Sequence, residues 1–290
     1  MKLSATCMNC LVQRQMENIR DFEDEESKSN YMKKVLSIIS EANEYETSPV
    51  IIAKISKLHQ EYFNSPYSFD LLKKQYNLMM LQKEESIWSK IQASSDSLLE
   101  AMKYSRIGNY IGFGAMGSID ENRLNSLLES VHEEYIESSK YQRFLKDLQN
   151  ANELVYLTDN CGEVVLDKLF IKCISDRFPK VHITVIVRGK IVLNDATIED
   201  AKMVGLMEIS EVIDNGTEMA GTCLELINNR AKECIETADM IISKGQGNFE
   251  TLNGCGLNIY YLFLCKCEWF VKRFKMERFK GVFSNERDCS

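Results

Sequence analysis

Hydrophobic positions in the first half of the chain recur with the spacing of amphipathic helices. Apolar residues fall at i, i+3 and i+4 with charged residues between them, and no stretch alternates convincingly with a period of two. Pro49, after Thr47-Ser48, suits the first turn of a helix, as does Ser65-Pro66. We therefore predict a helical domain over residues 1–150. Its helices are expected over 8–24, 29–43, 50–62, 68–104 and 121–149.

The pattern changes after residue 150. Short apolar runs alternate there with helical patterns, which favours a mainly parallel sheet with helices on its faces. The predicted strands are Leu154–Thr158, His182–Val187, Ile209–Ile213, Met240–Ser243 and Ile259–Leu264. Helices are expected over 163–177, 197–204, 222–237 and from about 250. The expected fold is α/β (α+β over the whole chain), with the helical domain packed on a three-layer α/β/α domain over 151–290.

Composition narrows the function classes. The 290 residues are 44% hydrophobic and 27% charged, and no apolar run approaches the roughly 20 residues that span a bilayer. The N-terminal segment lacks the apolar stretch of a signal peptide, so we expect a cytoplasmic protein. The formal charge of −8 and the lack of a basic stripe argue against a nucleic-acid partner. An acidic protein can still bind a phosphorylated metabolite through a divalent cation.

Polar residues follow each of the first four predicted strands. Asp159-Asn160 ends the first, Asn194-Asp195 lies in the loop after the second, and Asp214-Asn215-Gly216 ends the third. Lys244-Gly245-Gln246-Gly247-Asn248 follows the fourth, with Glu250 close behind. Carboxyl ends of parallel strands share the sheet edge at which open α/β folds bind ligands, so these residues should converge. For any single junction, an ordinary turn explains Asn, Asp and Gly equally well.

The chemistry that these groups suit is narrow. Asp159, Asn160 and Asp195 offer oxygen ligands without histidine or cysteine, which favours a hard ion such as Mg²⁺ or Mn²⁺. Lys244 adds a cation, and the glycines after it allow backbone N–H groups to approach an anion at a helix N-terminus. A metal beside an anion-binding loop suits a phosphate ester, because the metal can polarise the phosphoryl group and activate a water.

The same segments resemble a known family. TDNCGEVVLD, the Asn194-Asp195 pair in KIVLNDAT, IDNGTEMAGT and ADMIISKGQGNFETL are similar to motifs of the damage-control phosphatases, also called acidic-residue methyltransferase-like. The first half agrees through Cys7-x-x-Cys10, Pro66-Tyr67 followed by Lys74 and Asn77, and Ile107-Gly-Asn109. The resemblance covers essentially the whole chain and points to the prokaryotic branch with the N-terminal cysteine pair.

The resemblance implies a phosphatase of small phosphometabolites, such as sugar phosphates, that depends on Mn, Co, Ni or Mg. By matching motifs, Asp159, Asn160 and Asp195 would bind the metal. Residues 244–248, with Lys244 among the catalytic residues, would hold the substrate phosphate. The pocket would be lined by Asn109 and by Asp214, Asn215 and Gly216. Glu163 and Glu250 would support the site or move a proton, and Glu250 would also belong to the substrate-binding residues.

Two departures from the family pattern concern carboxylates. Gly112-Phe113-Gly114 stands where Asp-Phe-Gly is expected, and Ser65-Pro66-Tyr67 stands where Asp-Pro-Tyr is expected. Both losses bear on the identity of the substrate more than on the type of reaction.

Other chemistries remain open from the sequence. An S-adenosylmethionine-dependent methyltransferase or a non-catalytic phosphometabolite-binding protein could use the same sheet edge. Gly112–Gly117 formally matches the dinucleotide pattern G-x-G-x-x-G, but it lies between helical segments, where a flexible connection is simpler. An aspartyl-phosphate mechanism would make Asp159 a nucleophile. The second aspartate of the usual dehalogenase signature is Cys161 here, so we favour attack by metal-bound water.

The ten cysteines do not indicate a disulfide framework in a chain of this length for which we expect no signal peptide. Most are expected to be reduced and several to be small buried hydrophobes. Cys7 and Cys10 could join Cys265 and Cys267 in a second metal site if the N-terminal helix packs on the last predicted strand, because a zinc site needs about four ligands. The alternative is two pairs of buried thiols.

Overall fold

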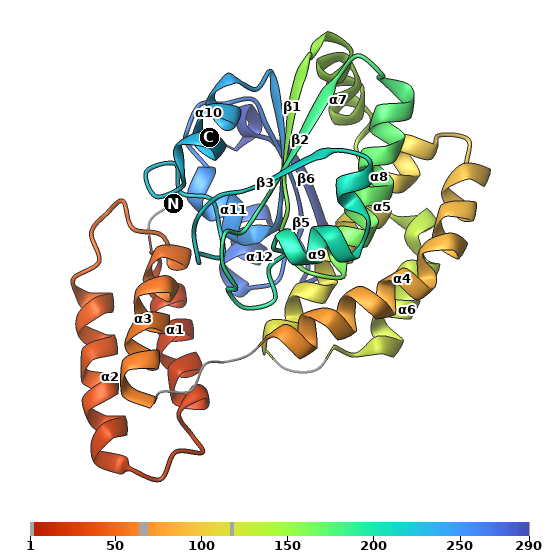
Figure 1. Cartoon of the computed structure of the whole chain (residues 1–290). Helices are drawn as coiled ribbons and strands as arrows, with labels where there is room; N and C mark the ends of the chain where they lie inside the picture. The colour runs from red at the N-terminus through yellow and green to blue at the C-terminus, as the bar shows by residue number, and fades with distance from the viewer. Residues whose placement is uncertain (1–2, 64–68, 117–118, 290) are drawn as a thin grey trace.

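The computed structural model describes residues 3–63, 69–116 and 119–289, and the Ser65-Pro66-Tyr67 segment lies outside them. Helices fill the first half of the chain and a sheet fills the second, as the sequence predicts (Figure 1). The first half contains α1 (Ala5–Asn18), α2 (Glu25–Ser40), α3 (Ser48–Phe63), α4 (Asp70–Ala93), α5 (Ser97–Gly108), η1 (Asn109–Met116), α6 (Glu121–Glu129), η2 (Val131–Glu133) and α7 (Ser138–Asn150).

The second half forms one six-stranded sheet of order β3-β2-β1-β4-β5-β6. All neighbours pair in parallel except β5 and β6, which are antiparallel, so the predicted α/β fold with a mainly parallel sheet is confirmed. The strands are β1 (Glu153–Leu157), β2 (His182–Val187), β3 (Glu211–Asp214), β4 (Met240–Lys244), β5 (Ile259–Leu264) and β6 (Gly281–Asn285). The helices are α8 (Glu163–Arg177), α9 (Ile198–Met203), η3 (Leu206–Glu208), α10 (Asn229–Thr237), α11 (Gly245–Leu252), α12 (Glu268–Phe274) and η4 (Glu286–Asp288).

The helix predicted over 121–149 is divided into α6, η2 and α7. Caps explain two further differences between the observed and the predicted helices. The pattern over 68–104 continues through a break at Asp96, whose carboxylate accepts from Leu99 N and starts α5. The helix predicted over 222–237 begins only at Asn229, after Asn228 caps it by accepting from Ala231 N. In contrast, α11 begins at Gly245, directly after β4, rather than near residue 250.

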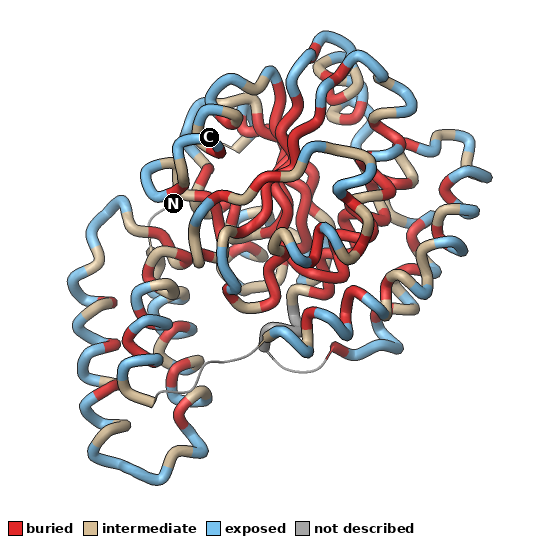
Figure 2. Tube along the Cα trace, in the orientation of Figure 1, coloured by how far each residue is buried: buried red, intermediate tan, exposed pale blue. Residues whose placement is uncertain are grey.

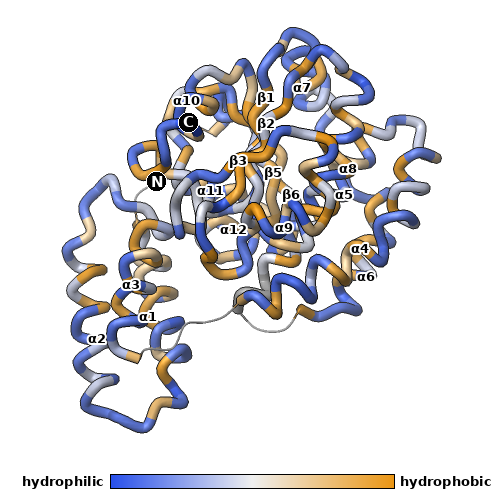
Figure 3. The backbone as a smooth tube through the Cα atoms, viewed as in Figure 1, coloured by the Kyte–Doolittle hydropathy of each residue, from blue (hydrophilic) through white to orange (hydrophobic). Residues whose placement is uncertain are grey.

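Alternating side chains divide the sheet between two cores. Leu154 and Tyr156 of β1 face the core that is shared with α4, α5, α7 and α8. Val155 and Leu157 face the opposite core, which packs under α10, α11 and α12. Figure 2 shows the strands as the most buried part of the molecule, and Figure 3 shows apolar strands surrounded by helices with polar outer faces. This period of two is what a sheet buried on both sides requires.

Helices α1, α2 and α3 pack around a separate core, which includes Tyr31, Val35 and Ile55. Helices α4 to α7 instead share their core with the sheet. The boundary at residue 150 therefore stays a prediction, and in packing terms the larger change lies between α3 and α4 (Figure 1). In the parts of the chain that the structure describes, no helix is both long enough and apolar enough to cross a bilayer.

Candidate active site

The loops after β1 and β2 are joined through their backbones. The N–H of Ala196 donates to the carbonyl of Asp159 at 2.8 Å, and Asn160 and Asp195 form an isolated antiparallel bridge. The three predicted oxygen ligands are thus brought together at the carboxyl edge of the sheet. All three are buried, with 8%, 4% and 3% of Asp159, Asn160 and Asp195 exposed.

Asn109, from the helical half, completes a small network around Asp159. Its Nδ2 donates to Oδ2 of Asp159 at 2.9 Å and to Glu163 at 3.0 Å. Nδ2 of Asn160 donates to the same oxygen of Asp159 at 2.6 Å and to Glu163 at 2.7 Å. Burial, followed by the charge of Glu163, raises the pKa of Asp159. Asn109 and Glu163 thus belong to the hydrogen-bond network of Asp159 and Asn160, and their predicted roles in lining the pocket and supporting the site stay predictions.

Asp195 is held by a buried arginine. Nε of Arg188 donates to Oδ2 of Asp195 at 2.7 Å, while its other nitrogens reach Thr222 at 3.2 Å and Asn248 at 3.1 Å. Burial raises the pKa of Asp195 to about 7, although Arg188 opposes the rise. One guanidinium thus connects the ends of β2 and β4 with the loop that precedes α10.

Lys244 does not face open space, contrary to its predicted contact with phosphate. Its Nζ is completely buried and lies 2.6 Å from Asp167, 2.8 Å from Glu163 and 2.7 Å from both the hydroxyl and the carbonyl oxygen of Ser105. Burial works against its charge, but Asp167 and Glu163 outweigh burial and raise the pKa of Lys244. Protein acceptors surround all three ammonium protons of Lys244. Lys244 is therefore an internal ion-pair partner of Glu163.

The loop after Lys244 is also more structural than predicted. Asn248 donates to the carbonyls of Thr158 (3.0 Å) and Lys244 (2.7 Å) and accepts from Arg188, so its carboxamide is used within the protein. Gln246 accepts from the N–H of Lys266 at 2.7 Å and thereby fixes the end of β5. A Cβ on Gly247 would overlap with a neighbouring loop carbonyl, which explains a glycine there.

Gly245 contacts the site most directly of the four residues after Lys244. Its φ is +81°, and a Cβ at this position would overlap with the carboxylate of Asp159. Glycine therefore serves two purposes at the first residue of α11: it adopts a left-handed backbone and lets a carboxylate approach the helix N-terminus.

The third junction behaves as an ordinary turn. Asp214 accepts from the N–H of Gly216 at 2.8 Å, and Asn215 accepts from Gly189 and Thr217. These interactions close the turn locally rather than direct the side chains to Asp159. Among the described residues, these bonds do not reach Asp159, Asn160 or Asp195, and the predicted pocket-lining role of residues 214–216 stays a prediction.

Glu250 lies on α11 and hydrogen-bonds with Ser48 of α3. The two helices pack against each other. Burial raises the pKa of Glu250 to about 7. A carboxyl group in this place contributes to the contact between the two helices, so its predicted role in proton transfer is not supported by its position.

Two cations of the site were not predicted from the sequence. Lys266 follows β5 and is partly buried; its Nζ lies where a Cβ on Gly112 would be, beside the amide of Asn160. Burial lowers the pKa of Lys266, while Asp159 and Glu163 oppose the fall. Lys266 and Arg188 each follow a strand of the sheet closely. This position in the sequence is the signal by which both residues could have been predicted to lie at the site. Gly112 itself lies in η1, over the site, while Gly117 lies outside the described residues.

The cysteines do not assemble the predicted second metal site. All ten are free thiols. Cys265 is buried in an apolar core, Cys10 is exposed on α1, and Cys7 and Cys267 are partly exposed. Over the described ranges, no three or more His, Cys, Asp and Glu residues gather closely enough to hold a metal ion. The candidate site at Asp159 is compatible with that finding because its third donor is a carboxamide.

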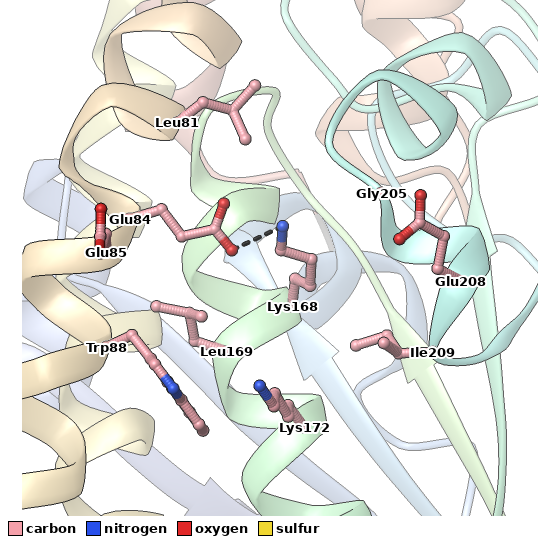
Figure 4. Close-up of a pocket in the computed structure, with 10 residues that line it drawn as sticks. All are labelled: Leu81, Glu84, Glu85, Trp88, Lys168, Leu169, Lys172, Gly205, Glu208 and Ile209. Carbon is pink, nitrogen blue, oxygen red and sulfur yellow. Dashed lines mark ion pairs between the residues drawn. The ribbon is translucent and has the colours of Figure 1, made fainter.

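In the described part of the chain, α4 lines at least two surface cavities. One of about 350 Å³ lies between α4, α8 and η3, beside the Glu84–Lys168 ion pair (Figure 4). It opens near the amino end of β3, opposite the edge that carries Asp159. The second, of about 620 Å³, adjoins the loop of Asp195 and is lined by residues that include Lys73, Lys74, Lys190, Thr197 and Asp200. Only the second cavity lies beside the loops of the candidate site.

The residues present fit a hard divalent cation. Two carboxylates and one carboxamide are the oxygen donors that Mg²⁺ and Mn²⁺ accept. The hydrogen bonds that Asp159 accepts from Asn109 and Asn160 both go to Oδ2, and Arg188 binds Oδ2 of Asp195. Groups that fix ligand carboxylates in this way are typical of metal sites in proteins.

Comparison with known proteins gives consistent matches. The family model of the damage-control phosphatase ARMT1-like domain matches residues 3–281. A damage-control phosphatase of Archaeoglobus fulgidus is 29% identical over 277 residues, which cover 92% of this chain and 93% of that protein. One of Pyrococcus horikoshii is 33% identical over 181 residues, or 61% of each chain. The crystal structure of a DUF89 family protein from Pyrococcus horikoshii is similar with a TM-score of 0.82, 25% identity and 99% coverage of both chains.

Proposed function

Because the chain belongs to the damage-control phosphatase family, as its motifs predict, we propose that it is a divalent-metal-dependent phosphatase of small phosphometabolites such as sugar phosphates. The observation that carries the proposal is the convergence of Asp159, Asn160 and Asp195, buried side by side at the carboxyl edge of the sheet. Family membership supports the phosphatase activity. The metal and the substrate class are the parts that we add.

These three residues would hold the cation, with Mn²⁺, Co²⁺, Ni²⁺ and Mg²⁺ as candidates. When bound, the cation would polarise the phosphoryl group and lower the pKa of a bound water, which would then attack phosphorus. The hydrogen bonds from Asn109 and Asn160 keep Asp159 in one orientation, which suits a ligand.

The other charged groups of the site have distinct roles in this proposal. Arg188 orients Asp195 through Nε. Lys244 compensates the buried charge of Glu163, which in turn accepts from the amides of Asn109 and Asn160. Lys266, beside Asn160, is the cation best placed to attract a phosphate group to the site.

A screen of phosphate esters against metals tests the proposal. Metal-free protein is assayed for phosphate release from a panel of sugar phosphates with each of the four cations. We expect release with at least one cation, and we expect Asp159→Ala to abolish it. No release from any ester with any cation, together with tight binding of S-adenosylmethionine, would favour a methyltransferase instead. Binding of phosphometabolites without turnover would favour a non-catalytic protein.

A further inference from the structure

We propose that two residues of α4, Lys73 and Asn77, form a positioning unit, the α4 bracket, that fixes the loop of Asn160 against the loop of Asp195. The inference rests on the proposed function, since it concerns how the same ligands are held. The hydrogen bonds of the bracket go to residues that follow the ligands along the chain, namely Gly162 after Asn160, and Thr197 and Asp200 at the start of α9 after Asp195. The bracket therefore acts through these residues, as a positioning element.

Asn77 connects both loops through a single carboxamide. Its Oδ1 accepts from the N–H of Gly162 at 2.6 Å, two residues after Asn160. Its Nδ2 donates to Oδ1 of Asp200 at 2.8 Å, five residues after Asp195. Asn77 is fully buried, so a relative movement of the two loops would break one of these bonds without water to replace it.

Lys73 strengthens the connection to the second loop. It lies one helical turn before Asn77 and therefore on the same face of α4. Its Nζ lies 2.7 Å from Oδ2 of Asp200 and 3.2 Å from the hydroxyl of Thr197, and both members of the ion pair are buried. The same oxygen of Asp200 caps α9 by accepting from the N–H of Thr197 at 2.8 Å. Lys73 thus compensates a buried charge that organises the chain just after Asp195.

The backbone of α4 also presses directly against the first loop. Gly162 has a φ of +70°, and a Cβ there would lie 3.0 Å from the carbonyl oxygen of Tyr76. A side chain at this position would push α4 away from the loop. Helix α4 therefore contacts the first loop in two ways: its backbone lies close to Gly162, and the amide of Asn77 accepts from the N–H of Gly162.

The bracket differs from a general packing contact because one amide joins two loops from different strands. A second contact of α4, the ion pair of Glu84 with Lys168 at 2.6 Å, binds the middle of the helix to α8. Glu84→Gln weakens that attachment and leaves the bracket intact, so it is the matched control. If the bracket positions the ligands, its loss should affect both loops together, whereas loss of the control contact should affect neither.

The experiment combines hydrogen–deuterium exchange of the metal-free protein with the affinity for Mn²⁺. Asn77→Asp keeps the acceptor for Gly162 but sets a carboxylate against Asp200. The double variant Asn77→Asp/Asp200→Asn exchanges the two groups and restores a donor–acceptor pair, but it also removes the ion pair of Lys73 with Asp200. Its reference is therefore Lys73→Gln, which removes the ion pair and leaves both hydrogen bonds of Asn77. Lys73→Gln is also the second variant if Asn77→Asp does not fold.

We expect Asn77→Asp to speed exchange in the segments 160–163 and 195–200 and to weaken Mn²⁺ binding by about 10- to 100-fold, the usual range for residues that support metal ligands. Lys73→Gln should change both properties less than Asn77→Asp, the double variant should recover them to the level of Lys73→Gln, and Glu84→Gln should match the parent. Parent-like exchange and affinity in Asn77→Asp would overturn the bracket, as would a double variant that stays at the level of Asn77→Asp. A parent protein that binds no Mn²⁺ would contradict the proposed metal, and the exchange data would then decide on the bracket alone.

Discussion

Nε of Arg188 lies 2.7 Å from Oδ2 of Asp195, and both side chains are almost completely buried. Arg188 follows β2 directly, so the strand fixes one end of this pair, and the guanidinium fixes the loop that returns Asp195 to the site. Its further hydrogen bonds go to Thr222, in the segment between β3 and α10, and to Asn248, in α11 after β4. The position of Asp195 therefore depends on an interaction that the local sequence does not show.

Removal of this arginine should be costly. Arg188→Met leaves the carboxylate of Asp195 buried beside Asp159 without its partner, and we expect a loss of about 3–5 kcal/mol in the free energy of unfolding. Urea denaturation measures it. The control is Arg143→Met, which breaks a partly exposed pair with Asp288 and should cost about 1 kcal/mol or less. Equal losses in the two variants would show that the buried pair has no special role.

Gly245→Ala should damage the site for steric reasons. The new Cβ would overlap with the carboxylate of Asp159 and displace it, which we expect to lower phosphate release by about 100-fold. Gly256 has the same φ of +81°, but a Cβ there would meet no other atom within 4 Å. Gly256→Ala therefore carries the same backbone cost of about 1–2 kcal/mol without the overlap. Similar activity of the two alanine variants would contradict this role of Gly245.

Binding of Mn²⁺ should strengthen as the pH rises through neutrality. The pKa of Asp195 is raised to about 7 and that of Asp159 is raised as well, so protons compete with a cation for both carboxylates. For one group with a pKa of about 7, affinity should increase about 10-fold from pH 6 to pH 8. Calorimetric titration at several pH values measures this change. An affinity that does not vary over this range would contradict the assignment of Asp195 as a ligand.

Glu250 should make stability depend on pH. Burial raises its pKa from 4.5 to about 7 in the folded protein, so the folded state holds a proton that the unfolded state releases. Stability should therefore fall as the pH rises from about 4.5 to 7 and then level off, by up to about 3 kcal/mol. Glu250→Gln should remove this component, whereas Glu129→Gln, at an exposed position on α6, should not. Parallel stability profiles for the parent and Glu250→Gln, measured by urea denaturation, would refute the prediction.

The fold followed from the sequence where the pattern was strong. The strands His182–Val187 and Ile259–Leu264 have the predicted bounds because each is a β-prone run that is buried on both faces, except for the exposed first residue His182. Strand β6 was not predicted, because it lies in a mixed polar tail and is stabilised by antiparallel pairing with β5. The sequence of residues 281–285 contains too little periodicity to indicate this partner.

The site was predicted in part, and the reason lies in long-range contacts. Asp159 was found because it comes almost directly after a buried strand, and Asp195 because it lies in the loop that follows the next strand along the chain. The direction of Lys244 could not be predicted, since its partners include Ser105, 139 residues away. Asn77 was noted only as part of a motif, and its role depends on contacts to Gly162 and Asp200 that only the folded chain brings together.

The central claim is that phosphate release depends on a divalent cation held by Asp159, Asn160 and Asp195. The most direct test is a Mn²⁺ titration of metal-free protein in which bound metal and released phosphate are measured on the same samples. The test variant is Asp159→Asn, and the control variant is Asp239→Asn. The carboxylate of Asp239 accepts from backbone N–H groups at the amino edge of the sheet, away from the site. We predict that binding and release rise together in the parent and in the control, and that both are lost in Asp159→Asn. Release that continues without metal, or Asp159→Asn that binds and turns over like the parent, would contradict the account.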